Sequence, residues 1–206
     1  MTREKNIIYI ARLVSLIFTP FYLPLVGLIA LFTFSYLNLL PVAYRLLVLA
    51  IIYLFTILMP TFFIHLYRRA QGWSLLELGQ KRRRMVPYGI SIVCYGACLW
   101  TLDKIHIYHF VSSIVLAALL VQIICAIINI WWKISTHTAG IGGVAGALFV
   151  FAEYFAFNPV WWLCGVLILA GILGSARIIL RQHSLSQVVA GFLIGFACAT
   201  TGIAFF

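Results

Sequence analysis

Long runs of apolar residues alternate with short polar stretches along the whole chain of 206 residues. A helix needs about 20 apolar residues to cross a bilayer core about 30 Å thick, and it satisfies its backbone polar groups internally. We therefore predict an all-α fold, a polytopic transmembrane bundle of six or seven spans in a single domain. The predicted spans cover residues 10–34, 43–66, 87–103, 107–132, 138–156, 159–176 and 186–206.

The first apolar segment is longer than one span and contains Pro20 and Pro24. Proline has no N–H to donate and interrupts a helix unless it lies in the first turn. We expect residues 7–19 to lie partly in the membrane interface, and the span itself to begin near the prolines. The basic start is followed by no small-residue cleavage site, which predicts that the segment is retained.

Composition supports a membrane location. The chain is 65% hydrophobic and 9% charged, with a mean hydropathy of +1.12, whereas soluble domains are about 45–50% apolar and about 25% charged. This excludes a soluble or disordered protein. The five cysteines lie inside apolar segments without the flanking ligands of a metal site, so they are interpreted as small membrane-buried residues.

Basic residues outnumber acidic ones by 14 to 4. In a membrane protein such an excess belongs to loops, lipid head groups or a phosphate-bearing substrate, so nucleic acid is not expected as a partner. The predicted topology places twelve basic residues on the side of the N-terminus, which the positive-inside rule would make cytoplasmic unless some of them serve a phosphate. They are Arg3, Lys5, Arg12, Arg68, Arg69, Lys81, Arg82, Arg83, Arg84, Lys133, Arg177 and Arg181.

Three polar motifs interrupt the helix ends on that same side: 81-KRRRMVP-87, 133-KISTHTAG-140 and 175-SARIILRQHSLSQ-187. Two spans separate each motif from the next, so each return brings the chain to the same membrane face. Ionisable groups at helix ends in a membrane chain tend to be functional. Small-residue spacing at Gly142/Gly146 and at Gly191/Gly195 predicts that helices approach closely there.

The order of these motifs resembles the type 2 phosphatidic acid phosphatase superfamily, a family of helical bundles that also includes the vanadium haloperoxidases. Its motifs are KxxxxxxRP, PSGH and SRxxxxxHxxxD. The third is matched by Arg177, five intervening residues and His183, with Ser175 one residue early. The resemblance covers about residues 45–206 and extends to a divergent bacterial branch of the superfamily.

The other two motifs match less fully. Ser135 and His137 agree with the second, while Ile134 and Thr136 stand where the family has proline and glycine. The first motif is matched only by a basic run, Lys81 to Arg84, that precedes Pro87, without the spacing of the family.

The resemblance implies a phosphoryl transfer site without metal or other cofactor. It implies His183 as the nucleophile that forms a phospho-histidine and His137 as the acid that protonates the leaving alcohol. Arginine suits phosphate because its planar fork donates paired hydrogen bonds. The implied phosphate-binding groups are Arg177, Arg84 or Lys81, Ser135, and the backbone amides around Thr136 at a helix N-terminus.

Gln187 is the main departure, because the family has Asp four residues after the nucleophilic histidine. One helical turn places this side chain against the His183 ring, so it can orient the ring but supplies no negative charge. In the serine protease example, changing the orienting Asp to Asn costs about 10⁴ in turnover. A second interpretation is structural: Ser184 to Gln187 has the S-x-x-Q pattern of a capping box.

The resulting hypothesis is an integral-membrane phosphatase that acts on a lipid phosphate monoester or diphosphate, with the bilayer and a phosphorylated lipid as partners. Phosphatidate, phosphatidylglycerophosphate, a polyprenyl diphosphate and a phosphorylated lipid A are candidate substrates, and a small soluble phosphate ester is another. Two alternatives are a catalytically lapsed relative that binds or moves a phospholipid, and a structural subunit of a membrane complex. The expected location is a bacterial cytoplasmic (inner) membrane, and the sequence predicts no oligomeric state.

Overall fold

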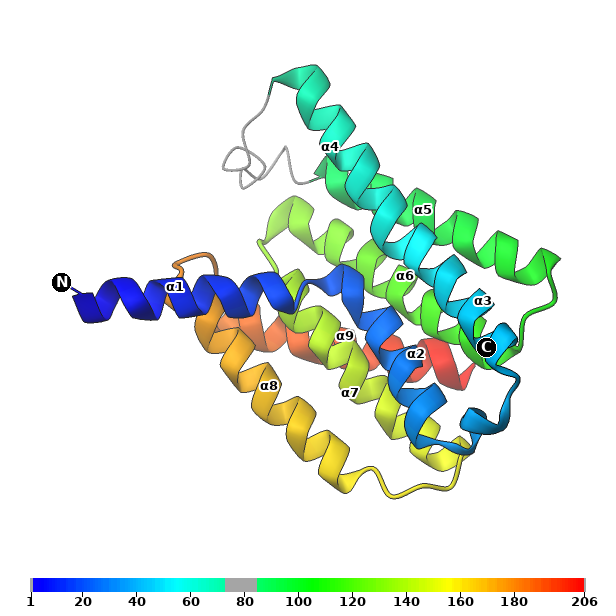
Figure 1. Ribbon diagram of the computed structural model, residues 1–206. Coiled ribbons are helices and arrows are strands. Elements are labelled where there is room, and N and C mark those ends of the chain that lie inside the picture. The colour runs from blue at the N-terminus through cyan, green and yellow to red at the C-terminus, as the bar shows by residue number, and fades with distance from the viewer. Residues whose placement is uncertain (1, 73–84, 206) are drawn as a thin grey trace.

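The computed structural model describes residues 2–72 and 85–205. Within these ranges the chain is helical and contains no strand, and Figure 1 shows the helices packed side by side in one bundle, with α1 extending beyond it. The helices are α1 (Thr2–Ile17), η1 (Pro20–Tyr22), α2 (Leu23–Phe34), η2 (Tyr36–Leu39), α3 (Val42–Tyr53), η3 (Leu54–Leu58), α4 (Met59–Gln71), α5 (Met85–Lys104), α6 (His109–Trp131), α7 (Thr136–Tyr154), α8 (Val160–Ile179) and α9 (Leu185–Ala204).

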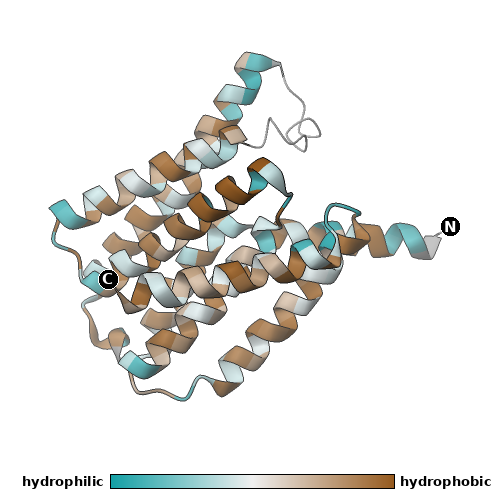
Figure 2. Ribbon diagram, turned by 180° about the vertical axis from the view of Figure 1, so that it is seen from behind, coloured by the Kyte–Doolittle hydropathy of each residue, from teal (hydrophilic) through white to brown (hydrophobic). Residues whose placement is uncertain are grey.

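Six helical segments of the described chain are long and apolar enough to cross a membrane, which agrees with the predicted polytopic membrane bundle. Figure 2 shows the apolar colouring along the lengths of the helices and the polar colouring mostly near their ends. The segments are Glu4–Thr33, Val42–Gln71, Met85–Lys104, His109–Trp131, Val160–Ile179 and Leu185–Ala204.

The helix is interrupted near the prolines, as predicted, but the candidate span runs across this break from Glu4 to Thr33, and the interfacial position of residues 7–19 stays a prediction. Helix α1 ends at Ile17, Pro20 begins the short 3-10 helix η1, and Pro24 lies in the first turn of α2. Proline is tolerated there because the first N–H groups of a helix have no internal partner. The break lets α1 leave the bundle in a direction different from that of α2 (Figure 1).

Helices α3 and α4 form one long segment that contains a π-helical turn, η3. Pro60 lies just after this turn, in the first turn of α4. Its missing N–H cannot continue the regular bonding ladder, and a π turn is one way in which a helix accommodates such a gap. Thr56 is fully buried, and its hydroxyl donates a hydrogen bond of 2.7 Å to the Ile52 carbonyl of the same helix. The buried hydroxyl therefore needs no partner on another helix.

Helix α7 corresponds to the predicted segment 138–156, but it is not among the six apolar spans. It lies inside the bundle, in contact with α2, α6, α8 and α9, and most of its side chains are buried or half-buried. Because its neighbours are mainly other helices, it can carry more glycine and threonine than a helix that faces lipid.

The predicted close approach of helices at the small residues is confirmed between α7 and α9. A Cβ atom added to Gly142 would overlap the Phe192 carbonyl, and one added to Gly195 would overlap the Ala139 carbonyl. Without side chains at these positions the two backbones come into direct contact. This contact fixes the start of α7 against the start of α9, where two of the three polar motifs lie.

Candidate functional site

The second and third motifs meet at the beginnings of α7 and α9. The backbone N–H of Ser135 donates to the carbonyl of Gln187 over 3.4 Å. Gly191 lies one turn further along α9, and a Cβ atom added there would come within 2.6 Å of the Ser135 carbonyl and the Thr138 hydroxyl. The sequence analysis placed these two motifs on one membrane face, and the structure brings them into contact.

Ser135 is the N-cap residue of α7. Its hydroxyl accepts the Thr138 N–H over 3.4 Å, and the Thr138 hydroxyl donates to the Ser135 carbonyl over 3.1 Å. Ser135 is fully buried, so in this structure its hydroxyl satisfies a free amide at the helix start. Thr136 is the first residue of the helix and is half-buried.

His183 is held at one ring nitrogen by Gln187. The Gln187 Oε1 atom accepts the Ser184 backbone N–H over 3.2 Å and also lies 3.2 Å from Nδ1 of His183. Because a backbone N–H can only donate, the atom it meets is the amide oxygen, and Nδ1 must then carry the proton. The neutral ring therefore keeps its lone pair on Nε2. The capping box at Ser184 and the orientation of His183 are both present.

Helix α1 contributes a residue that the sequence analysis did not select. The Ser15 carbonyl lies 3.2 Å from Nε2 of His137, and the Ser15 hydroxyl accepts a short hydrogen bond from Nη1 of Arg177. Since a carbonyl only accepts, His137 carries its proton on Nε2. The carbonyl lies in the last turn of α1, where helix carbonyls lack internal partners. The signal was the spacing of Arg12, Ser15 and Thr19 along one helical face.

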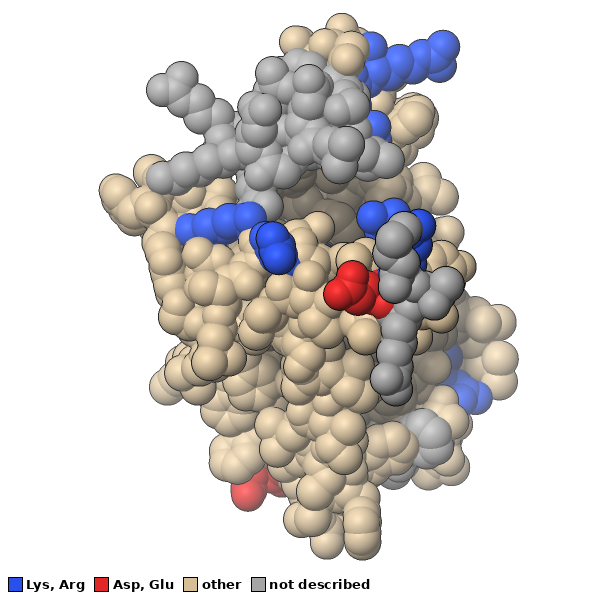
Figure 3. All heavy atoms as spheres, turned by 90° about the vertical axis from the view of Figure 1, so that its left-hand side faces the viewer, with Lys and Arg blue, Asp and Glu red and all other residues tan. Residues whose placement is uncertain are grey.

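These groups line a hollow that we call the polar pocket. Its walls come from α1, from the start of α7 and from the turn between α8 and α9, and it contains three guanidinium groups but no carboxylate. Figure 3 shows Lys and Arg side chains over the upper half of this end of the molecule, with an acidic side chain between them, and few charged side chains in the lower half. The polar pocket is lined by Ile8, Arg12, Ser15, Leu16, Thr19, His137, Arg177, Ile179, Leu180, Arg181 and Gln182.

Arg181 is another pocket residue that the sequence analysis left without a role. It has a φ of 52°, in the left-handed region where glycine is usual. The N–H groups of Arg181 and Gln182 donate to the carbonyls of Ile178 and Arg177, which is the Schellman pattern of a helix end. An arginine held in this conformation at the rim of a basic pocket points to a functional reason for its presence.

His137 lies at the end of the bundle, outside the six apolar spans. Burial lowers the pKa of His137 from 6.5 to about 3, and the nearby Arg177 and His183 lower it further, against the effect of the Ser15 carbonyl. The ring is therefore neutral near pH 7 while the pocket is empty. Because an unfolded histidine titrates near 6.5, this group destabilises the fold as the pH falls from 6.5 towards 3.

Other predicted residues are distributed differently. His183 is buried and follows Gln182, but it does not itself line the polar pocket. Lys81 and Arg84 lie outside the described residues, so the part predicted for the first motif stays a prediction. Within residues 2–72 and 85–205, no group of three His, Cys, Asp or Glu side chains is placed to hold a metal ion.

Comparison of the chain with protein-family models, with curated proteins and with solved structures finds no match.

Proposed function

We propose that this chain is an integral-membrane phosphatase for a lipid phosphate monoester or diphosphate, and a divergent member of the type 2 phosphatidic acid phosphatase superfamily. One observation carries the proposal: three guanidinium groups and His137 surround a pocket without carboxylates, next to a histidine whose Nδ1 proton is fixed by Gln187. Such a pocket favours a multiply charged anion, and arginine matches the oxygen geometry of phosphate.

In the proposed reaction Nε2 of His183 donates its lone pair to phosphorus, and the bond from phosphorus to the ester oxygen breaks. His137 donates a proton to that oxygen, so the alcohol leaves as a neutral molecule. Water then attacks the phospho-histidine, His137 takes its proton, and the bond from phosphorus to Nε2 breaks. Inorganic phosphate is released and both histidines return to their starting states. Arg177 stabilises the negative charge of the phosphoryl oxygens throughout.

The protonation of His137 follows from the pocket electrostatics. In the empty pocket the ring is neutral, with its proton on Nε2 and the Ser15 carbonyl as partner. Its Nδ1 atom has no hydrogen-bond partner among the described residues. A bound phosphate brings negative charge next to the ring and raises its pKa, so that the site acquires the acid it needs when substrate is present.

The position of the pocket supports a substrate anchored in the bilayer. It lies at the ends of α7 and α8, beside the exposed apolar surface of α1. A lipid can keep its hydrocarbon part among the helices while its phosphate reaches this end of the bundle.

The first experiment measures phosphate release by the purified protein from a panel of lipid mono- and diphosphates. We expect release to be lost in His183→Ala and retained in His65→Ala, an exposed histidine on α4 that serves as the matched control. Equal rates in wild type and His183→Ala would overturn the proposal. A phosphoenzyme that is labile to acid and absent from His183→Ala would identify the covalent intermediate.

Gln187 favours a second candidate function, because a neutral amide orients His183 but cannot stabilise its positive charge. A catalytically lapsed protein with the same pocket would bind a lipid phosphate without cleaving it. We expect such a protein to release no phosphate from any substrate, and to retain lipid phosphates in the wild type but not in Arg177→Ala.

A further inference from the structure

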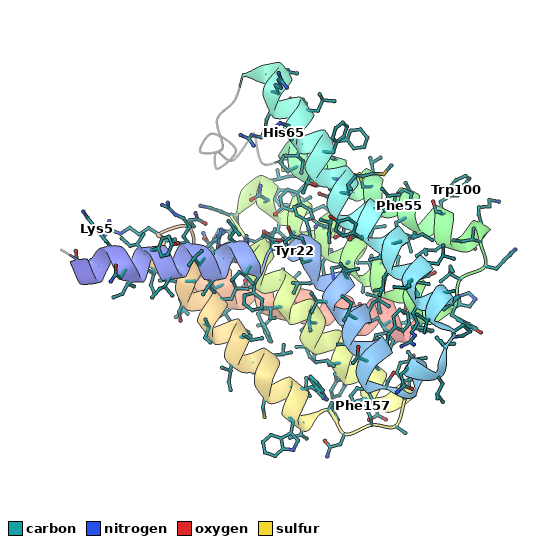
Figure 4. All side chains as sticks on the ribbon, in the orientation of Figure 1. Lys5, Tyr22, Phe55, His65, Trp100 and Phe157 are labelled. Atoms are coloured by element: carbon teal, nitrogen blue, oxygen red, sulfur yellow. The ribbon has the colours of Figure 1, made fainter. Side chains whose placement is uncertain are left out.

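A second cavity, of about 330 Å³, runs along the inside of the bundle. We call it the apolar groove. Its walls come mainly from α2, α6, α7 and α8, and on α7 they extend from Gly140 to Phe151. Figure 4 shows Tyr22 where α1 gives way to α2, and Phe157, which lines the groove, at the opposite end of α2.

The apolar groove begins beside the polar pocket. Phe18 and Pro20 line the groove, while Ser15 and Thr19 line the polar pocket, so the break between α1 and α2 borders both. On α7, Gly140 of the groove lies one helical turn after His137 of the polar pocket. The two cavities therefore lie side by side at this end of the bundle.

The dimensions of the groove limit what can fill it. Eleven residue steps along α7 correspond to about 16 Å, so a groove of about 330 Å³ is long and narrow. A helix with its side chains is about 10–12 Å across and does not fit. A hydrocarbon chain does fit, because its carbon atoms pack about 3.5–4.0 Å from their neighbours.

Two glycines keep the groove open from opposite walls. A Cβ atom added to Gly27 on α2 would meet nothing within 4 Å. One added to Gly143 on α7 would meet nothing closer than the Gly195 carbonyl at 3.8 Å. Both residues line the groove and both have room for a Cβ atom, so we expect a larger side chain at either position to reduce the space in the groove.

We propose that the apolar groove binds one hydrocarbon chain of the substrate whose phosphate occupies the polar pocket. This inference rests on the proposed function and specifies its substrate as a lipid phosphate with at least one long apolar chain. A small soluble phosphate ester would occupy the polar pocket and leave the apolar groove empty. The occupant belongs to the substrate and is distinct from a structural lipid of the bilayer.

The test uses monoalkyl phosphates from butyl to hexadecyl, with the protein in phosphatidylcholine nanodiscs. In the wild type kcat/KM rises with chain length, at most roughly fourfold for each methylene that the groove buries. In Gly143→Leu the ratio of the hexadecyl to the butyl rate falls by about 10- to 100-fold, and Gly27→Leu shows the same loss from the opposite wall. Gly165→Leu is the matched control, on an exposed face of α8 outside the groove, and keeps the wild-type ratio.

Failure of the groove and failure of the enzyme give different results. If the ratio of the hexadecyl to the butyl rate is unchanged in both groove variants, the apolar groove does not bind the chain. The proposed phosphatase function is unaffected by that result. If the wild type releases no phosphate at all, the proposed phosphatase function is wrong. The affinities of the wild type for hexadecyl and butyl phosphate then test the apolar groove by themselves. Tighter binding of hexadecyl phosphate that is lost in Gly143→Leu but kept in Gly165→Leu supports the groove, and equal binding of both esters by the wild type overturns it.

Discussion

Two regions hold the candidate site in different ways. The α7–α9 region fixes the second and third motifs by direct backbone contact at Gly142 and Gly195 and by the cap residues of both helices. Helix α1 completes the polar pocket from outside, through packing on α8 and two hydrogen bonds of Ser15. The second and third motifs are thus positioned by backbone contacts that leave no room for a larger side chain, whereas helix α1 is held on the pocket by packing and by two hydrogen bonds.

The largest effect is expected at the α7–α9 contact. Gly195→Ala places a methyl group on the Ala139 carbonyl, so we expect a loss of about 3 kcal/mol of stability and of all activity. Gly171→Ala, in open space on α8, is expected to be neutral or stabilising by up to about 1 kcal/mol. Thermal unfolding in detergent measures both. Equal stability of the two variants would contradict the backbone contact.

The next effect concerns the orientation of His183. Gln187→Leu removes the acceptor for both Nδ1 and the Ser184 N–H, and we expect turnover to fall by about 10² to 10⁴, by analogy with a triad that loses its tautomer control. Gln187→Glu keeps the acceptor and adds charge, so we expect faster turnover and a rise in the pKa seen in the pH–rate profile. A mere capping role predicts a loss of about 1 kcal/mol of stability with an unchanged pH profile.

A moderate effect is expected from anion binding at His137. Sulfate is a dianion at neutral pH and does not itself take up a proton. Any proton taken up when sulfate binds is therefore bound by the protein. Because the pKa of the empty site is about 3 and a bound anion raises it, we expect sulfate affinity to increase several-fold between pH 7 and pH 5. Calorimetry measures the affinity, and His137→Gln should remove its pH dependence. The same pH dependence in that variant would assign the proton to another group.

The smallest effect is expected at the covering rim. Arg181→Gly relieves a left-handed conformation and should raise stability by about 1 kcal/mol, while it weakens sulfate binding in the polar pocket. Arg181→Lys keeps the backbone cost and the charge but loses the planar fork, so it should leave stability unchanged and weaken sulfate binding less than Arg181→Gly does. If Arg181→Gly strengthened the fold and left sulfate binding intact, Arg181 would have no part in the site.

Much of the site could be predicted because it depends on residues that are close together in the sequence. Proline positions predict the break after α1, and small-residue spacing predicts the α7–α9 contact. The S-x-x-Q pattern predicts the capping box, and one helical turn from His183 to Gln187 predicts their hydrogen bond. Each of these depends on residues a few positions apart or on helix packing with strict size limits.

The sequence by itself determined which segments are helices, that the first segment is interrupted at its prolines, and that the polar motifs share one end of the bundle. Only the tertiary structure decided what covers that end. Ser15 meets His137 and Arg177 across separations of 122 and 162 residues, and the two cavities share the break between α1 and α2 as a wall. Such contacts depend on the direction in which α1 leaves α2. That direction is set by packing on α8, and no pattern within α1 encodes it.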